Sequence, residues 1–280
     1  MLSARDARRD TGRRPAFPSL RQLYDEYVLQ RIEGYKNSIS REELMRLAGE
    51  ATAVLHNGPD DQFVLTEVLM ADVVDAVIIK RLRIKSFRRW KEQFARLRTA
   101  QREPTHWGLD RTSPVVSLLG RLEPGDRALV IGGRAESSAY LLAAHDLELR
   151  FWDDDLGIVD KVEQRMGEES LAARFFACCV PLDRWIPSDG SPYDVLVLDV
   201  GALAMVEPHR RPGVVAQLQE LTAHGGVHVL LPAPDLVPEA IYSAYAGWVR
   251  EKPTSSRRAA ATGAVLVKPV PQEVRRVEPA

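Results

Sequence analysis

The second half of the chain alternates short apolar runs with segments of helical periodicity, and this alternation restricts the possible folds more than any other feature. Helices are expected at about 136–144, 156–167, 211–223 and 236–246. Apolar strands joined by helices are typical of a parallel sheet with both faces covered. In such a sheet, ligands bind beyond the carboxyl ends of the strands. The strands are expected at 128–132, 147–152, 174–179, 194–199, 226–231, 247–251 and 263–268.

Residues 19–110 show helical periodicity instead. Ser19 precedes one stripe of apolar residues, and Ser40 with Glu43 makes a capping box before a second stripe. Residues 62–82 are apolar on nearly every side, which predicts a helix buried at the centre of a bundle. The first half is therefore expected to be an all-helical domain.

The net charge of −1 is spread unevenly over the 280 residues. Residues 1–110 hold 20 basic and 16 acidic side chains, a net of +4, whereas residues 111–280 hold 18 and 23, a net of −5. Charge and periodicity together predict four segments. These are a flexible arginine-rich arm at 1–18, a helical domain at 19–110, a sheet domain at 111–270 and a tail at 271–280.

Composition predicts a cytoplasmic protein. A hydrophobic content of 45% with 28% charged residues is typical of a soluble globular chain. No apolar run is long enough to cross a bilayer, and the N-terminus lacks the apolar segment of a secretory signal. The two cysteines are adjacent, which excludes a disulfide framework and favours a reducing compartment.

Residues 80–102 form the most strongly basic stretch, with ten basic side chains and one acidic. Phe87, Trp90 and Phe94 lie on one helical stripe, which is expected to be buried, so that the cations point outward. Such a face binds phosphates or an acidic surface, and we predict RNA or an acidic protein as partner, within a larger assembly. The alternative is a solvated helix. The residues predicted to bind the partner are Lys80, Arg81, Arg83, Lys85, Arg88, Arg89, Lys91, Arg96 and Arg98.

The first expected strand is followed by Gly132 and Gly133 and then by a helix of small residues. Backbone N–H groups at a helix start attract polar or anionic ligand groups, and glycine lets a ligand approach the backbone. The next strand ends at Asp153 and Asp154, and Asp153 stands 21 positions after Gly132. That spacing suits an acid that binds ribose hydroxyls. Alternatively, the glycines make a tight turn and the aspartates cap the next helix.

These segments resemble a known family. The stretches "DRALVIGGRAES", "LRFWDDD", "YDVLVLDVGAL" and "LTAHGGVHVLLP", with the ending "GWVREKPTSSRRAAATGAVLVKP", are similar to the class I S-adenosylmethionine-dependent methyltransferases over residues 120–270. The resemblance implies a Rossmann-like α/β fold, with a mostly parallel sheet and an antiparallel last strand. It also implies S-adenosylmethionine as cofactor, bound by Gly132, Gly133, Asp153 and Asp154, with Asp199 as the catalytic residue.

The sequence departs from the family pattern at the cofactor loop. Val130 stands where the first motif has an acid, and Arg134 and Glu136 replace its second and third glycines. The acid that often follows the third strand is missing there, and Cys178 and Cys179 occupy the place. We expect both cysteines to belong to the sheet core.

Three functions therefore remain open. The chain is an active methyltransferase acting on RNA or protein, an inactive methyltransferase-fold subunit that binds or assembles other molecules, or a regulator that binds a nucleotide or small molecule. A dinucleotide-dependent dehydrogenase fits less well, because only the first glycine of its Gly-x-Gly-x-x-Gly motif is present. No metal is expected, since a glycine pair and a probable strand separate His224 from His228.

Overall fold

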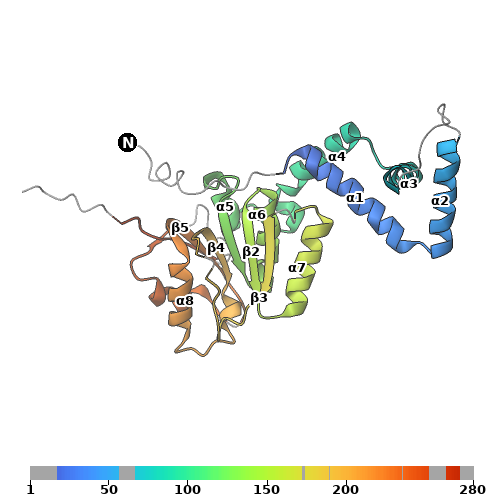
Figure 1. Cartoon of the computed structure of the whole chain (residues 1–280). Coiled ribbons are helices and arrows are strands. Elements are labelled where there is room, and N and C mark those ends of the chain that lie inside the picture. Colours follow the sequence, from blue (N-terminus) through green and yellow to red (C-terminus); the bar gives the residue numbers. More distant parts are fainter. Residues whose placement is uncertain are drawn as a thin grey trace, which may run out of the picture. The chain divides into compact units, whose positions relative to one another are not determined.

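The computed structural model describes residues 18–56, 67–171, 174–188, 190–234, 236–251 and 263–271. The chain divides into two compact units that meet between Leu97 and Arg98, and each is described here by itself (Figure 1). Apart from Pro18 and Pro271, the predicted arm and tail lie outside the described residues.

The N-terminal unit is helical, as predicted. It contains α1 (Leu20–Ser38), α2 (Arg41–His56), α3 (Glu67–Arg81) and most of α4 (Phe87–Gln101). Ser19 caps α1 in a complete capping box: its Oγ accepts the N–H of Gln22 at 3.2 Å, and the Gln22 side chain accepts the N–H of Ser19 at 2.7 Å. Ser40 Oγ likewise accepts the N–H of Glu43 at 3.2 Å, which confirms the predicted start of α2.

A small apolar core holds these helices together. Its buried members are Ile32, Leu47 and Ile78, one from each of the first three helices. The prediction that α3 is buried on every side was wrong, because Ile78 is the one buried residue among those of α3 whose exposure is described. Within this unit α3 packs against α1 and α2, so two neighbours cover only part of its surface.

The C-terminal unit is built on one seven-stranded sheet in the order β3-β2-β1-β4-β5-β7-β6. The strands from β1 to β5 are parallel, and β7 is antiparallel to both β5 and β6. The Rossmann-like α/β fold with an antiparallel last strand is therefore confirmed. The strands are β1 (Arg127–Ile131), β2 (Glu148–Asp153), β3 (Phe175–Cys179), β4 (Tyr193–Asp199), β5 (Thr222–Leu231), β6 (Val249–Arg250) and β7 (Ala264–Val267).

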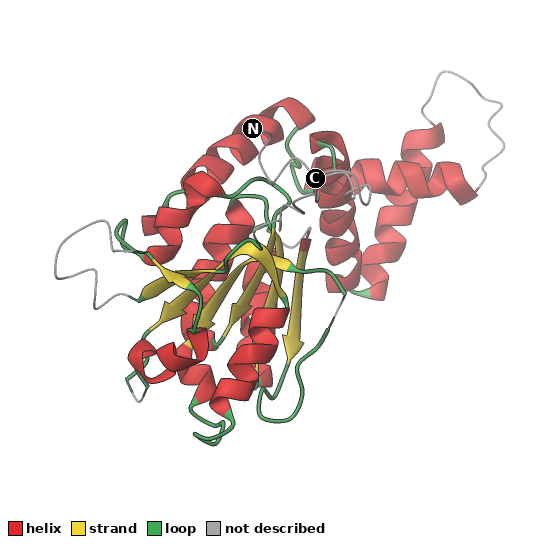
Figure 2. Ribbon diagram, turned by 90° about the vertical axis from the view of Figure 1, so that its left-hand side faces the viewer, coloured by secondary structure: helices red, strands yellow, loops and turns green. Residues whose placement is uncertain are grey.

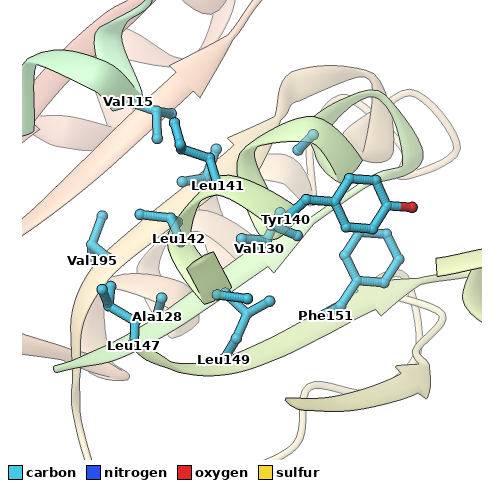
Figure 3. Packing of buried hydrophobic residues seen from close by; sticks show 14 of the residues in the cluster. Val115, Ala128, Val130, Tyr140, Leu141, Leu142, Leu147, Leu149, Phe151 and Val195 are labelled. Carbon is cyan, nitrogen blue, oxygen red and sulfur yellow. The ribbon is translucent and has the colours of Figure 1, made fainter. Parts of the chain in front are cut away.

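Helices cover both faces of this sheet (Figure 2). Alternate residues of β1 point to opposite cores: Val130 packs with α6 and α7 on one face, and Leu129 packs with α8 on the other. Figure 3 shows the first core, where Tyr140 of α6 and Phe151 of β2 belong to the same cluster. The helices are α5 (Pro114–Leu118), α6 (Glu136–Ala144), α7 (Leu156–Glu168), α8 (Arg211–Glu220) and the 3-10 helix η7 (Pro238–Tyr245).

The boundary between the units falls earlier than the predicted boundary at 110/111. Gln101, at the end of α4, is fully buried, and its Nε2 donates to the backbone oxygen of Glu169 at 2.8 Å. Trp107 belongs to the first sheet core and donates its Nε1–H to the backbone oxygen of Gln101 at 2.6 Å. The segment after Leu97 therefore packs with the sheet, because a buried tryptophan anchors it there.

A buried polar network lies in the second core. The Thr222 hydroxyl donates to the Leu218 oxygen at 2.9 Å, so its oxygen accepts from His228 Nε2 at 2.6 Å. His228 Nδ1 in turn accepts from the Tyr245 hydroxyl at 2.8 Å. His228 is completely buried, and burial lowers its pKa to about 3, so the ring is neutral with the proton on Nε2.

Candidate functional site

The predicted site residues meet at the carboxyl edge of the sheet. Gly132 follows β1 directly, Asp153 is the last residue of β2, and Asp199 is the last residue of β4. Since β1 lies between β2 and β4, the two aspartates flank the glycine loop. The sheet register brings the Gly132 N–H to 2.9 Å from the Trp152 oxygen.

Close neighbours surround both glycines, and the backbone of Gly132 requires glycine. Gly132 has a φ of 95°, and a Cβ there would lie 2.7 Å from Asp199 Cβ. A Cβ on Gly133 would lie 2.8 Å from Ile158 Cδ1. The side chains of Asp199 and Ile158 thus already occupy the space beside this loop.

The two aspartates are buried against the main chain. Asp153 is 7% exposed, and its Oδ1 accepts the N–H of Asp155 at 2.9 Å. Burial raises its pKa, while hydrogen bonds from the N–H groups of Asp155 and Gly133 act in the opposite direction. Asp153 therefore already holds the loop after β1 through the Gly133 N–H.

Asp199 holds the same loop from the other side. It is 5% exposed, and its Oδ1 accepts the N–H of Gly201 at 2.9 Å. Burial raises its pKa as well, opposed by the hydrogen bonds of Gly201 and Arg134 N–H and by the positive charge of Arg134. The loop N–H groups of Gly133 and Arg134 thus both have carboxylate partners within the chain.

A shallow pocket that opens to solvent lies beside Asp153, and Asp199 is not among the described residues that line it. Three aspartates, Asp153, Asp154 and Asp183, are among the residues that line it. No basic residue is among the described residues that line it. The apolar lining is Ile131, Val180, Leu182, Ala202, Met205 and Val206.

Asp183 was missed by the sequence analysis. The acid expected after the third strand seemed absent because Cys178 and Cys179 stand at the strand end, but Asp183 follows a few residues later and lines the pocket. The expectation that both cysteines belong to the core was wrong for Cys179. This residue is exposed, and its Sγ lies 3.4 Å from the backbone oxygen of Asp154. The sequence signal was the "PLD" that ends the apolar run.

The two residues that replace motif glycines do not line the pocket. Arg134 is exposed in the 3-10 turn before α6. Glu136 pairs with Lys161 of α7, with both carboxylate oxygens 2.9–3.0 Å from Nζ. The Glu136–Lys161 pair therefore connects the start of α6 with α7.

No family model matches the chain, and no curated protein matches its sequence. Solved structures do match. The N-methyltransferase NodS from Bradyrhizobium japonicum WM9 has 15% identity and a TM-score of 0.44, covering 57% of this chain and 94% of its own. A putative rRNA methylase from Clostridium thermocellum has 13% identity and a TM-score of 0.43, covering 56% and 94%. These likenesses are too weak to carry an argument about activity.

The sheet itself decides the fold class. Its mostly parallel order ends with β7 running antiparallel between β5 and β6, as the resemblance implies. The chain has a Rossmann-like α/β fold with an antiparallel last strand. Gly132, Gly133, Asp153 and Asp154, which the resemblance predicts to bind the cofactor, lie at the carboxyl edge of the sheet.

The predicted partner-binding residues lie outside the Rossmann-like fold, with one exception. They are found at the end of α3, in the turn after it and on α4, and Arg98 alone belongs to the second unit. The described residues include no group of three or more histidine, cysteine or acidic side chains able to hold a metal ion. Nor does any described helix have the length and apolarity needed to span a membrane.

Proposed function

We propose that the chain binds S-adenosylmethionine in the pocket at the carboxyl edge and acts as a methyltransferase. The observation that carries the proposal is the pocket's chemistry: three carboxylates and apolar walls. Carboxylates accept hydrogen bonds from ribose hydroxyls and attract a positively charged ligand, and they repel phosphate. This set suits a nucleoside cofactor without phosphates better than a nucleotide or dinucleotide.

In this proposal the nucleoside part of the cofactor lies at Asp154. Asp154 is exposed at the pocket and is available to the ribose, whereas Asp153 is buried and already holds the loop. S-adenosylmethionine supplies an activated methyl group when it is bound. We propose that Asp199 positions the glycine loop, because its carboxylate already accepts the N–H groups of Gly201 and Arg134. A catalytic role for Asp199 stays a prediction from the resemblance.

A second candidate function is a methyltransferase-fold subunit that has lost catalysis. The observation that favours it is the engagement of the loop itself: the Gly133 and Arg134 N–H groups have carboxylate partners, and Ile158 lies against Gly133. N–H groups that are already bonded are not free to bind the carboxylate of the cofactor's amino-acid part. In this case the fold serves binding or assembly.

Calorimetry with S-adenosylmethionine, S-adenosylhomocysteine and adenosine separates the two candidates. If the cofactor binds, S-adenosylhomocysteine should raise the melting temperature. At a ligand concentration of a hundred times its Kd, the free energy of unfolding should rise by roughly 2.7 kcal/mol. Binding of adenosine alone would show that only the nucleoside part is held. The absence of heat and of any melting shift at millimolar ligand would favour the non-catalytic subunit.

Asp154→Ala is expected to weaken the binding of S-adenosylhomocysteine by about 10-fold or more, because a hydrogen bond to a charged group contributes about 1.5–3 kcal/mol. Asp160→Ala is the matched control, since Asp160 is an exposed aspartate of α7 that does not line the pocket. Calorimetric titration of both variants measures the difference. Equal affinities for the two variants would contradict the assignment of Asp154 to the ribose.

A further inference from the structure

The cations of residues 80–102 fall into two groups. Some are held by partners within their own unit, among them Lys85, whose Nζ donates to Gln93 Oε1. Arg81 donates to the Tyr35 hydroxyl at 3.0 Å and pairs with Glu43 and with Glu50, the latter at 2.9 Å. Arg98 and Arg102 both pair with Asp146 in the sheet unit. These arginines stabilise the fold, so we leave them out of the binding surface.

The other group, which lies at the end of α3, in the turn after it and on α4, is named here the basic face. Its side chains are all exposed, and none of them has a side-chain partner within the part of the chain that the structure describes. One exposed acid, Glu92, lies among them in the sequence. The basic face consists of Lys80, Arg83, Arg88, Arg89, Lys91 and Arg96.

The aromatic side of α4 determines which residues point outward. Trp90 is 9% exposed, and its ring lies 4.8 Å from Phe94 and 5.4 Å from Tyr24 of α1, measured between centroids. Phe87 also contacts Tyr24, at 5.4 Å. Since these rings pack together, they are not available to stack on bases. A ligand of the basic face would therefore be recognised by charge alone.

The composition of the surface indicates the class of partner. Protein–protein interfaces have an apolar or aromatic centre that is depleted in charge, whereas nucleic-acid interfaces are polar and strongly positive. Among the described residues from 80 to 97, none is a large apolar side chain that is exposed. Insertion into a membrane surface also needs exposed apolar residues.

We propose that the basic face binds the phosphate backbone of nucleic acid, without reading its bases. Arg88 and Lys91 are three residues apart on α4, and residues at this helical spacing lie about 5–6 Å from each other, which lets the two cations reach successive phosphates. The arginines offer bidentate hydrogen bonds to phosphate oxygens. This inference is independent of the proposed methyltransferase activity and would hold for a non-catalytic subunit as well.

Fluorescence anisotropy with the full chain tests the proposal, using a mixed-sequence RNA single strand of about 20 nucleotides. Each neutralised phosphate contributes a slope of about −0.7 to log affinity against log salt, so four to six contacts predict a fall on the order of a hundredfold between about 50 and 200 mM salt. Arg88→Gln with Arg89→Gln should flatten that slope by about 1.4. A second RNA of unrelated sequence should bind equally well.

Arg111→Gln with Arg184→Gln is the control, because both arginines are exposed in the other unit and the change in net charge is the same. It should leave affinity and slope unchanged, and circular dichroism melts should confirm that both double variants stay folded. The proposal is overturned if the RNA affinity of the folded Arg88/Arg89 variant equals that of the control. It is also overturned if a polyglutamate peptide or an anionic vesicle binds the wild-type chain more tightly than the RNA does.

Discussion

Lowering the pH from 7 to 5 is expected to reduce the free energy of unfolding by about 2 kcal/mol through His228 alone. Burial lowers the pKa of this histidine to about 3, whereas its ordinary value is 6.5. The folded state therefore binds fewer protons than the unfolded state. The stabilising contribution is complete above pH 6.5 and is lost progressively as the pH falls toward 3.

The matched variant is His228→Gln, which has no titrating ring and can still donate and accept hydrogen bonds. It should be less stable than wild type at pH 7, because the contacts with Thr222 and Tyr245 are fitted to imidazole. Its stability should fall less between pH 7 and 5. Urea unfolding at both pH values gives the comparison, and an equal fall in both proteins would contradict the role of His228.

The pH dependence of stability must be compared between wild type and His228→Gln, because other buried groups change stability with pH in the direction opposite to His228. Burial raises the pKa of Asp153 and Asp199, so in the folded state these carboxyls take up protons at higher pH than in the unfolded chain. Their burial costs stability at neutral pH, and acid relieves that cost. The wild-type profile therefore sums opposing contributions, whereas subtraction of the His228→Gln profile isolates the histidine.

The strands of the sheet were predictable from sequence because each is a short apolar run between turn signals. The middle residues of β1 and β4 alternate between two cores, which requires a continuous apolar run there. The boundary between the units after Leu97 was harder to predict from sequence, because it depends on the packing of Trp107 into the sheet core. Likewise, periodicity in α3 did not reveal how many helices surround it.

The candidate site was predictable in its position and not in its bonding. Gly132 and Asp153 were found because strand ends in a parallel sheet share one edge. The hydrogen bonds from loop N–H groups to Asp153 and Asp199 depend on the path of the main chain, which the sequence does not specify. The contact of Ile158 with Gly133 is tertiary for the same reason. These contacts, which the sequence did not predict, determine whether the N–H groups of the loop are free to bind a cofactor.

Trp90→Ala is expected to destabilise the helical unit by about 3–5 kcal/mol, the range found for deleting a buried aromatic. Trp90 packs against Phe87 and Phe94 of its own helix and against Tyr24 and Tyr27 of α1, so its removal opens a cavity among four rings. Trp185→Ala is the control, because Trp185 is 55% exposed and a surface change of this kind costs within about 0.5 kcal/mol.

Urea unfolding followed by far-ultraviolet circular dichroism measures both variants, with a separate transition allowed for each unit. A loss below about 1 kcal/mol for Trp90→Ala would contradict the packing of α4 on α1. The same variant should also weaken RNA binding, because the aromatic contacts determine which side of α4 faces outward. Arg88→Gln with Arg89→Gln should weaken RNA binding with little change in stability. The two variants thus separate the contribution of folding from the contribution of charge at one helix.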